Sequence, residues 1–256
     1  MPQTERSVSR RGRGLIQLQS DTAAADPASA HWEHSLPKSY ADFTVDPFTL
    51  GVLCPEQAPI PALDDPKVLP SVVEAVAESL IPVTGERITA QTVYFDAGWT
   101  EAAPFIVARR GVVERLREAA ATLPEHFGLC VLDAWRPLSL QAALHADAPR
   151  GFKCAPNDDP NLPPPHLSGG AVDITLTWNG QPLSLGTEFD AYRDDAWTLA
   201  FEETPGLIRE LRRLLYWTMQ RAGFIVLDCE WYHFEHGTPR WAALSGDDAI
   251  YAAVAP

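Results

Sequence analysis

The chain has 256 residues, of which 46% are hydrophobic and 21% are charged, and these proportions are typical of a globular protein with a sizeable core. The net charge is −14 and the sequence pI is about 4.8. This balance argues against nucleic acid and against an anionic membrane as partners, because both need clustered Lys and Arg. No apolar run has the length of a signal peptide or a membrane span, so we expect a cytoplasmic protein.

Residues 1–70 differ in composition from the rest of the chain. They begin with an arginine-rich segment, continue with small residues and then contain many prolines without a helical or strand period. We expect residues 1–30 to be flexible, and residues 31–70 to form an irregular, extended segment that wraps around the domain. The regular domain is predicted to span residues 71–256.

The first half of this domain contains both helical and strand patterns. Valines at helical spacing predict a short helix over residues 71–80, and residues 87–95 have strand character. Residues 104–123 form an amphipathic pattern that predicts a helix with Pro104 in its first turn. An apolar strand is expected at 128–133, followed by a helix over 139–146 with Ser139 as its N-cap.

The second half begins with a long loop over residues 147–165, which is rich in Pro, Asp and Asn. Residues 171–178 alternate as a strand, and residues 205–222 predict an amphipathic helix with its arginines opposite the leucines. Two final strands are expected, at 224–227 and 231–235. This mixed order predicts an α+β fold, with a small antiparallel or mixed sheet flanked by helices.

The four cysteines lie at positions 54, 130, 154 and 229, and none belongs to a Cys-x-x-Cys pair. A structural zinc knuckle is therefore not expected. In a chain of this length we expect free, partly buried thiols rather than a disulfide framework.

Two short segments carry the residue types of a catalytic zinc site. The first runs from His166 to Asp173, and the second is Glu230-Trp-Tyr-His233. Two imidazoles and a carboxylate can ligate zinc and leave a fourth position for water, and the second carboxylate can act as a general base. Glu230 and His233 would point to opposite faces of a regular strand, so we expect a twist or bulge at the two residues between them.

The surrounding sequence gives further support, although single residues remain ambiguous. Asp173 lies within an apolar strand, where a buried charge must be compensated. Arg136 ends another apolar strand; it can form a structural ion pair with Asp133, or it can stabilise the oxyanion of a tetrahedral intermediate. His236 lies close to the site but is expected to have a supporting or surface role. The remaining histidines have no pattern that indicates a metal: His31, His34, His126 and His145.

Taken together, three ordered motifs resemble the D-alanyl-D-alanine dipeptidases, VanX-type zinc peptidases related to the D-Ala-D-Ala carboxypeptidases. The motifs are Asp-Ala-Trp-Arg-Pro, the His166–Asp173 segment and Glu-Trp-Tyr-His, within roughly residues 85–240. The resemblance implies one zinc ion per chain, with His166, Asp173 and His233 as ligands. It also implies that Glu230 is the general base and acid, and that Arg136 stabilises the tetrahedral intermediate. The chain departs from the family pattern at Pro164, Leu167, Ser168 and Tyr232.

A fourth matching segment, Leu185-Gly-Thr-Glu-Phe-Asp190, concerns the substrate. By the resemblance, Asp190 would pair with the free ammonium of a small dipeptide, which selects dipeptides over longer chains; the alternative is an ordinary exposed loop residue. The predicted activity is hydrolysis of D-Ala-D-Ala or a similar small dipeptide. Three alternatives stay open: a related cell-wall D,D-carboxypeptidase or endopeptidase, a zinc-binding module without turnover, and a structural interaction protein.

Overall fold

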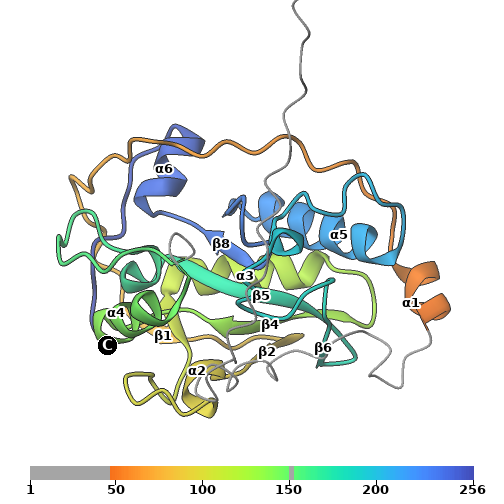
Figure 1. Ribbon diagram of the computed structural model, residues 1–256, viewed down its shortest axis with the longest axis horizontal. Helices are drawn as coiled ribbons and strands as arrows, with labels where there is room; N and C mark the ends of the chain where they lie inside the picture. The colour runs from red at the N-terminus through yellow and green to blue at the C-terminus, as the bar shows by residue number, and fades with distance from the viewer. Residues whose placement is uncertain (1–46, 150–152) are drawn as a thin grey trace, which may run out of the picture.

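The α+β prediction is confirmed by the computed structural model, which describes residues 47–149 and 153–256 (Figure 1). The main sheet has the strand order β2-β4-β5-β8-β7, and β6 pairs with β5 at one end. Its strands are β2 (Ile88–Ala90), β4 (Phe127–Asp133), β5 (Ala171–Trp178), β6 (Gln181–Pro182), β7 (Ile225–Val226) and β8 (His233–Glu235). β2 and β4 are parallel, and the other neighbours in this sheet are antiparallel. A separate antiparallel pair joins β1 (Leu80–Pro82) to β3 (Val107–Arg109).

The central strands β4 and β5 lie where the sequence predicts strands, at 128–133 and 171–178, and both are completely buried. Along β5 the apolar residues Val172, Ile174 and Leu176 alternate with Asp173, Thr175 and Thr177. Successive side chains of a strand point to opposite faces, so one face of β5 contributes to the hydrophobic core and the other is polar. The polar face is therefore where a site can be built on the sheet.

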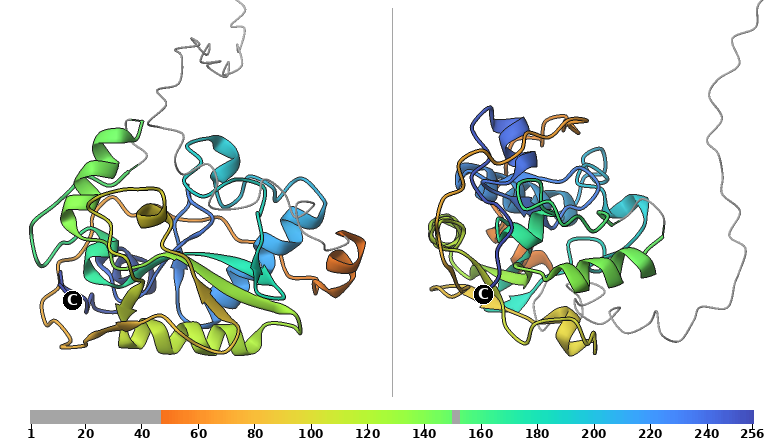
Figure 2. Two further views of the ribbon diagram at one scale, coloured as in Figure 1. Left: turned by 90° about the horizontal axis from the view of Figure 1, so that it is seen from below. Right: turned by 90° about the vertical axis from the view of Figure 1, so that its left-hand side faces the viewer.

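The helices cover both faces of the main sheet. In the left view of Figure 2, α3 (Arg110–Thr122) and α5 (Leu207–Arg221) lie on one side of the sheet, and α2 (Val93–Asp96) and α4 (Leu138–Asp147) lie on the other. The remaining helical elements are α1 (Pro47–Leu53), η3 (Pro165–Ser168), η4 (Asp194–Ala196) and α6 (Pro239–Ser245). No helix in the described ranges is both long enough and apolar enough to span a membrane.

The segment that follows α1 runs as an extended strap past α5 and α6, across the top of Figure 1. The indole nitrogen of Trp217 on α5 donates to the carbonyl of Ala58, at 2.7 Å, and Arg240 on α6 pairs with Asp65 at 2.9 Å. The expectation of an extended wrapping segment therefore holds for residues 54–70. It is wrong for residues 47–53, which form α1. The predictions for residues 1–46 lie outside the described part of the chain.

The prediction of a helix over residues 71–80 is wrong. Residues 71–79 form neither helix nor strand, and Leu80 begins β1. The backbone of residues 71–79 bonds to distant segments: the amide of Val72 donates to Asn161, and that of Val76 donates to Ile250. Val73 is 90% exposed, so the helical spacing of the valines does not correspond to a buried face. Branching at Cβ also disfavours a helix here.

Three further details of the predicted helices are wrong. The helix expected from Pro104 begins only at Arg110, because residues 107–109 pair with β1 as β3. Ser139 is not an N-cap, since α4 begins at Leu138 after Pro137. On α5, Arg212 and Arg213 are buried rather than exposed. The Arg212 guanidinium donates to three backbone carbonyls, those of Leu185, Asp195 and Trp197. These bonds hold the segment between β6 and α5 against the helix.

Candidate metal centre

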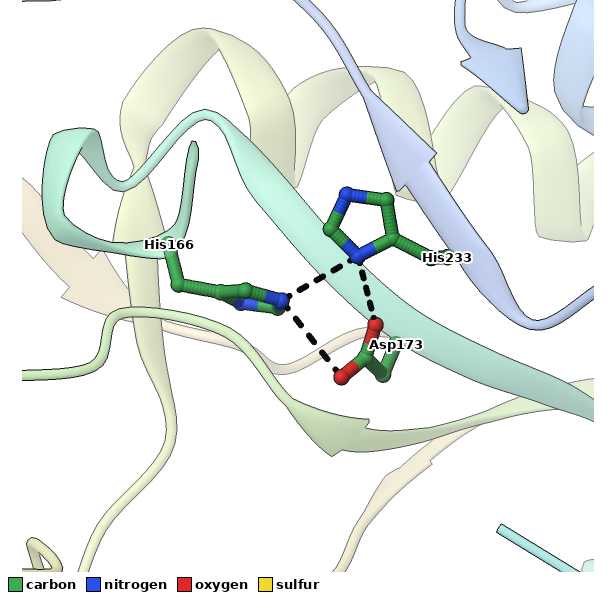
Figure 3. Close-up of side chains that lie close together, drawn as sticks. All are labelled: His166, Asp173 and His233. Atoms are coloured by element: carbon green, nitrogen blue, oxygen red, sulfur yellow. Dashed lines mark hydrogen bonds and ion pairs between the residues drawn. The ribbon is translucent and has the colours of Figure 1, made fainter. Parts of the chain in front are cut away.

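Three side chains that the sequence analysis assigned to zinc meet at one point on the polar face of the sheet (Figure 3). The Nε2 atom of His166 lies 3.2 Å from Nδ1 of His233. The carboxylate of Asp173 lies 2.9 Å from the same His233 nitrogen and 3.4 Å from the His166 nitrogen. All three residues are buried. They therefore form a compact set of donors that can hold a metal ion.

The register of the sheet explains why two of these residues meet. Asp173 and His233 are direct partners across the antiparallel pair of β5 and β8. Side chains at such paired positions lie on the same face of the sheet, with Cβ atoms about 5 Å apart. A register shift in β4 after Val131 places Asp133 opposite Asp173 as well. The sheet thus gathers the polar groups of three strands at one position.

His166 reaches the same point from the short helix η3 just before β5. Gly169 ends η3 with a φ of 72°, and its amide donates to the carbonyl of His166 at 3.0 Å. A Cβ atom at Gly169 would lie 2.6 Å from Leu80, and one at Gly170 would lie 2.7 Å from the carbonyl oxygen of His236. Glycine is therefore required at this turn, which lets His166 and Asp173 converge.

The outer nitrogen of each imidazole has its own partner. His166 Nδ1 lies 2.7 Å from the carbonyl oxygen of Ala134, and His233 Nε2 lies 3.1 Å from a carboxylate oxygen of Glu235. Both partners accept hydrogen bonds, so each outer nitrogen carries the hydrogen in a neutral imidazole. The inner nitrogens then present their lone pairs to the site. This support of ligating histidines by a carbonyl and a carboxylate is typical of metal centres.

The electrostatics of the site favour a positive charge at its centre. Burial alone would raise the pKa of the Asp173 carboxyl, but the two histidines hold it well below its ordinary value. Burial alone would lower the pKa of His233, yet hydrogen bonds with Asp173 and Glu235 raise it to about 10. Carboxylates that attract a proton this strongly also attract a divalent cation.

The donors fit zinc in type and in spacing. Zinc binds imidazole nitrogen and carboxylate oxygen at about 2.1 Å in tetrahedral geometry, which places neighbouring donors about 3.4 Å apart. The observed separations of 2.9, 3.2 and 3.4 Å lie close to that value. Three protein ligands leave one tetrahedral position for water or substrate, as in catalytic zinc sites.

The site opens into a cavity of about 580 Å³, a size suited to a small ligand. His166, His233, Glu230 and Arg136 all line this cavity. Glu230 reaches it because the chain turns at Trp231 and Tyr232, where the amide of His233 donates to the carbonyl of Glu230 at 3.1 Å. This turn confirms the irregularity that was predicted between Glu230 and His233.

Comparison with known proteins shows which protein family the chain resembles. A family model described as D-ala-D-ala dipeptidase matches residues 97–245, which is more than half of the chain. The chain belongs to the D-Ala-D-Ala dipeptidase family. It is 30% identical over 180 residues to a D-alanyl-D-alanine dipeptidase of Synechocystis sp., a match that covers 53% of this chain and 71% of the relative. It is 32% identical over 108 residues to a D-alanyl-D-alanine dipeptidase of Escherichia coli, covering 42% and 54% respectively.

The family match includes Arg136, for which the sequence left two roles open. Its guanidinium forms an ion pair with Asp133 at 2.7 Å and donates to Gln141 at 2.8 Å. It also lies 3.5 Å from Asp173 and lines the cavity. The ion pair thus fixes a buried cation beside the candidate metal ligands.

Asp190 is buried and does not line the cavity. One of its oxygens lies 2.6 Å from the ammonium of Lys153, and the other accepts from the hydroxyl of Tyr94, also at 2.6 Å. Lys153 does line the cavity, and its ammonium lies 3.6 Å from Glu230. The pairing of Asp190 with a substrate ammonium therefore stays a prediction. In this structure the ammonium beside the Asp190 carboxylate is that of Lys153.

Sequence reasoning missed two residues of this site. Glu235 follows His233 by two positions and therefore shares its face of β8, which is a signal that the sequence contained. Lys153 lies in the long loop, and no local pattern indicates its partner. His236 does not join the donors: its buried ring contacts Arg115 and the carbonyl of Gly223, and neither of these is a candidate ligand.

Proposed function

We propose that this family member is a zinc-dependent dipeptidase that hydrolyses D-Ala-D-Ala or a similar small dipeptide. The observation that carries the proposal is the set of His166, Asp173 and His233 at close to tetrahedral spacing, beside a cavity lined by the two histidines, Glu230 and Arg136. The names of the relatives support the substrate. The family relationship supports a peptidase, and the donor types favour zinc.

In this proposal His166, Asp173 and His233 hold the zinc ion. When bound, zinc supplies a Lewis acid and lowers the pKa of water toward neutrality. Glu230 accepts a proton from the attacking water and then delivers it to the leaving amine. Burial raises the pKa of the Glu230 carboxyl, and the nearby Lys153 lowers it only in part, which suits a group that both accepts and donates a proton.

Arg136 supplies positive charge for the oxyanion that develops on the substrate carbonyl. Its bonds to Asp133 and Gln141 fix the guanidinium before the substrate binds, so little reorganisation is needed during the reaction. For a free dipeptide, Asp190 is our predicted partner of the substrate ammonium. We also retain the prediction that the protein works in the cytoplasm.

A second candidate is a related D,D-carboxypeptidase or endopeptidase that cleaves a peptide ending in D-Ala. The pair of Lys153 and Asp190 favours it, because the carboxylate predicted to bind a free ammonium already has a cationic partner. A zinc-binding module without turnover is less well supported. Such a module needs neither a buried arginine beside the metal ligands nor a glutamate in the same cavity.

The test is hydrolysis of D-Ala-D-Ala, L-Ala-L-Ala and N-acetyl-D-Ala-D-Ala by the full-length protein, with and without added zinc. Zinc-dependent release of D-alanine from either D,D-peptide, with the L,L-dipeptide left intact, is the expected result. Zinc bound without hydrolysis of any peptide would contradict the proposed activity. The ratio of the hydrolysis rates of D-Ala-D-Ala and N-acetyl-D-Ala-D-Ala distinguishes the dipeptidase from the second candidate.

A further inference from the structure

The arginine and lysine side chains that line the cavity differ in how far their donors are used. In the described chain these residues are Arg136, Lys153 and Arg240. The Arg136 guanidinium donates to Asp133 and Gln141, and the Lys153 ammonium pairs with two carboxylates. Arg240 keeps donors without an acceptor, so it is the cation of this cavity that can still bind an anion.

Arg240 lies in the first turn of α6, and its side chain is only 10% exposed. Its Nη1 atom donates to Oδ1 of Asp65 on the strap, at 2.9 Å. Its Nε and Nη2 atoms are buried and have no hydrogen-bond partner in the described part of the chain. Buried donors are nearly always paired, because leaving one unpaired costs free energy. Two unpaired donors on one guanidinium therefore indicate an acceptor that the described residues do not supply.

Glu235 lies close to Arg240 but is not that acceptor. Its Oε1 atom is 3.9 Å from Arg240 Nε, which allows an ion pair but is too long for a hydrogen bond. Both oxygens of Glu235 already accept from other groups, Oε1 from His233 and Oε2 from the hydroxyl of Thr238. Glu235 therefore keeps the guanidinium beside a candidate metal ligand without using its Nε and Nη2 donors.

The unused donors of Arg240 match a carboxylate. Nε and Nη2 are neighbours on one edge of the planar guanidinium, and two parallel hydrogen bonds from such an edge fit the two oxygens of a carboxylate. Arg240 lines the same cavity as His166 and His233, so an anionic ligand of this cavity can supply the acceptor.

The substrate of the proposed reaction carries such a group near the metal. In a free dipeptide, only the amide nitrogen and one Cα atom lie between the scissile carbonyl and the terminal carboxylate. A residue that binds this carboxylate must therefore lie close to the metal ligands. Arg240 meets this condition, because only the Glu235 carboxylate separates its Nε atom from the outer nitrogen of His233.

We propose that Arg240 is a specificity-determining residue that binds the C-terminal carboxylate of the substrate. The inference rests on the proposed dipeptidase function and defines its substrate class further, as peptides whose released residue carries a free carboxylate. Asp65 positions the guanidinium for this role, so the strap, which lies outside the residues 97–245 matched by the family model, contributes to the site. A C-terminal amide has no negative charge and cannot replace the carboxylate on Arg240.

The experiment compares kcat and KM for D-Ala-D-Ala and for its C-terminal amide at saturating zinc, with the full-length wild type and Arg240→Met. The matched control is Arg213→Met: the Arg213 side chain is also 10% exposed and pairs with Glu202, but it does not line the cavity. We expect the wild type and the control to favour the acid in kcat/KM by about tenfold or more.

In Arg240→Met the preference for the acid should fall by about tenfold or more, through a higher KM for the acid. The KM of the amide should stay close to its wild-type value. A purely structural role of Arg240, or a loss of zinc affinity through Glu235, would affect both substrates alike and leave their ratio unchanged.

A second variant covers a loss of folding in Arg240→Met, where Asp65 and Glu235 lose their cationic partner. Arg240→Lys keeps the charge but not the planar pair of donors, so its preference for the acid should be about threefold or more below that of the wild type. The inference is overturned if the wild type hydrolyses the acid and the amide equally well. It is equally overturned if the ratio is the same in the wild type and in whichever of these two variants folds.

The test also separates this inference from the proposed function. If the protein hydrolyses neither substrate, the proposed function fails, and dissociation constants for both are measured by calorimetry on the same proteins. Tighter binding of the acid than of the amide to the wild type, lost in Arg240→Met, would still support the role of Arg240. Equal binding of the two, or no binding of the acid, would overturn it.

Discussion

Two glutamates lie close to His233 and differ in what they contact. Both line the cavity, but Glu230 pairs with Lys153, whereas Glu235 accepts from the outer nitrogen of His233 and from the hydroxyl of Thr238. One is therefore placed to act on a substrate, and the other to orient a metal ligand. Substitutions at these two positions should affect different measurements.

We expect Glu230→Gln to lower kcat by about 10²–10⁴-fold, because the amide cannot accept the proton of the attacking water. Zinc content should remain at that of the wild type, since Glu230 is not a ligand in our proposal. Steady-state kinetics and metal analysis of the same sample check both points. Full activity in Glu230→Gln would exclude it as the general base.

Glu235→Gln is the matched substitution and should behave differently. Loss of the carboxylate that holds His233 should weaken zinc binding by about 10–100-fold. Competition with a chromophoric chelator measures this affinity, and activity should recover when zinc is supplied in excess. Unchanged zinc affinity would show that Glu235 does not support the ligand.

The pH profile of kcat/KM should depend on Lys153. Burial raises the pKa of the Glu230 carboxyl, and Lys153 opposes this increase. A general base must be ionised, so activity falls as the pH drops through this pKa. Lys153→Met removes the attraction for the carboxylate, and the acidic limb should move to higher pH. Lys153→Arg should leave the limb close to its wild-type position; a limb that stays in place or moves lower in Lys153→Met would contradict the coupling.

At the scale of elements, the site depends on how β5, β8 and η3 are joined. β4 and β5 could be predicted from sequence because their burial gives an apolar run and a regular alternation. For Glu230 and His233, the sequence showed only that a twist or bulge between them is needed to bring both to one site. The turn itself could not be predicted, because a turn within a strand-like run has no periodic pattern. The segment over residues 71–79 could not be predicted correctly, because its backbone hydrogen bonds are to residues far away in the sequence.

Gly169→Ala tests the turn between η3 and β5. Its φ of 72° and the contact with Leu80 at 2.6 Å should cost about 1–3 kcal/mol of stability and displace His166, so that zinc binds more weakly. Gly180→Ala is the control, with a φ of 79° and no atom within 4 Å of the added methyl group. It should lose some stability but keep its zinc affinity. Urea unfolding and zinc titration measure the two effects, and equal zinc affinity in both variants would contradict the role of the turn.

At the scale of the whole molecule, the strap of residues 54–70 packs against the rest of the domain. Ile60 is buried in the main core, and Ala58 and Asp65 bond to α5 and α6. The boundary predicted at residue 70 therefore marks a change in composition, but residues before it pack against the same core as residues after it. For the same reason Lys153 could not be assigned from sequence: its partners Asp190 and Glu230 are distant along the chain and meet it only in the folded protein.

Ile60→Ala should lower the free energy of unfolding by about 2–5 kcal/mol, because it leaves a cavity under the strap. Val68→Ala, at a position that is 82% exposed on the same strap, should change it by no more than about 0.5 kcal/mol. Chemical denaturation of the full-length variants gives both values. Equal stabilities would show that the strap does not contribute to the core.

The most direct test of the central claim is a zinc titration of the chelator-treated, full-length protein, followed by release of D-alanine from N-acetyl-D-Ala-D-Ala and D-Ala-D-Ala. We expect no release without metal and a plateau at one zinc ion per chain, which His166→Ala should not reach. Activity that survives chelation, or that rises equally in His166→Ala, would contradict a catalytic zinc site built from His166, Asp173 and His233.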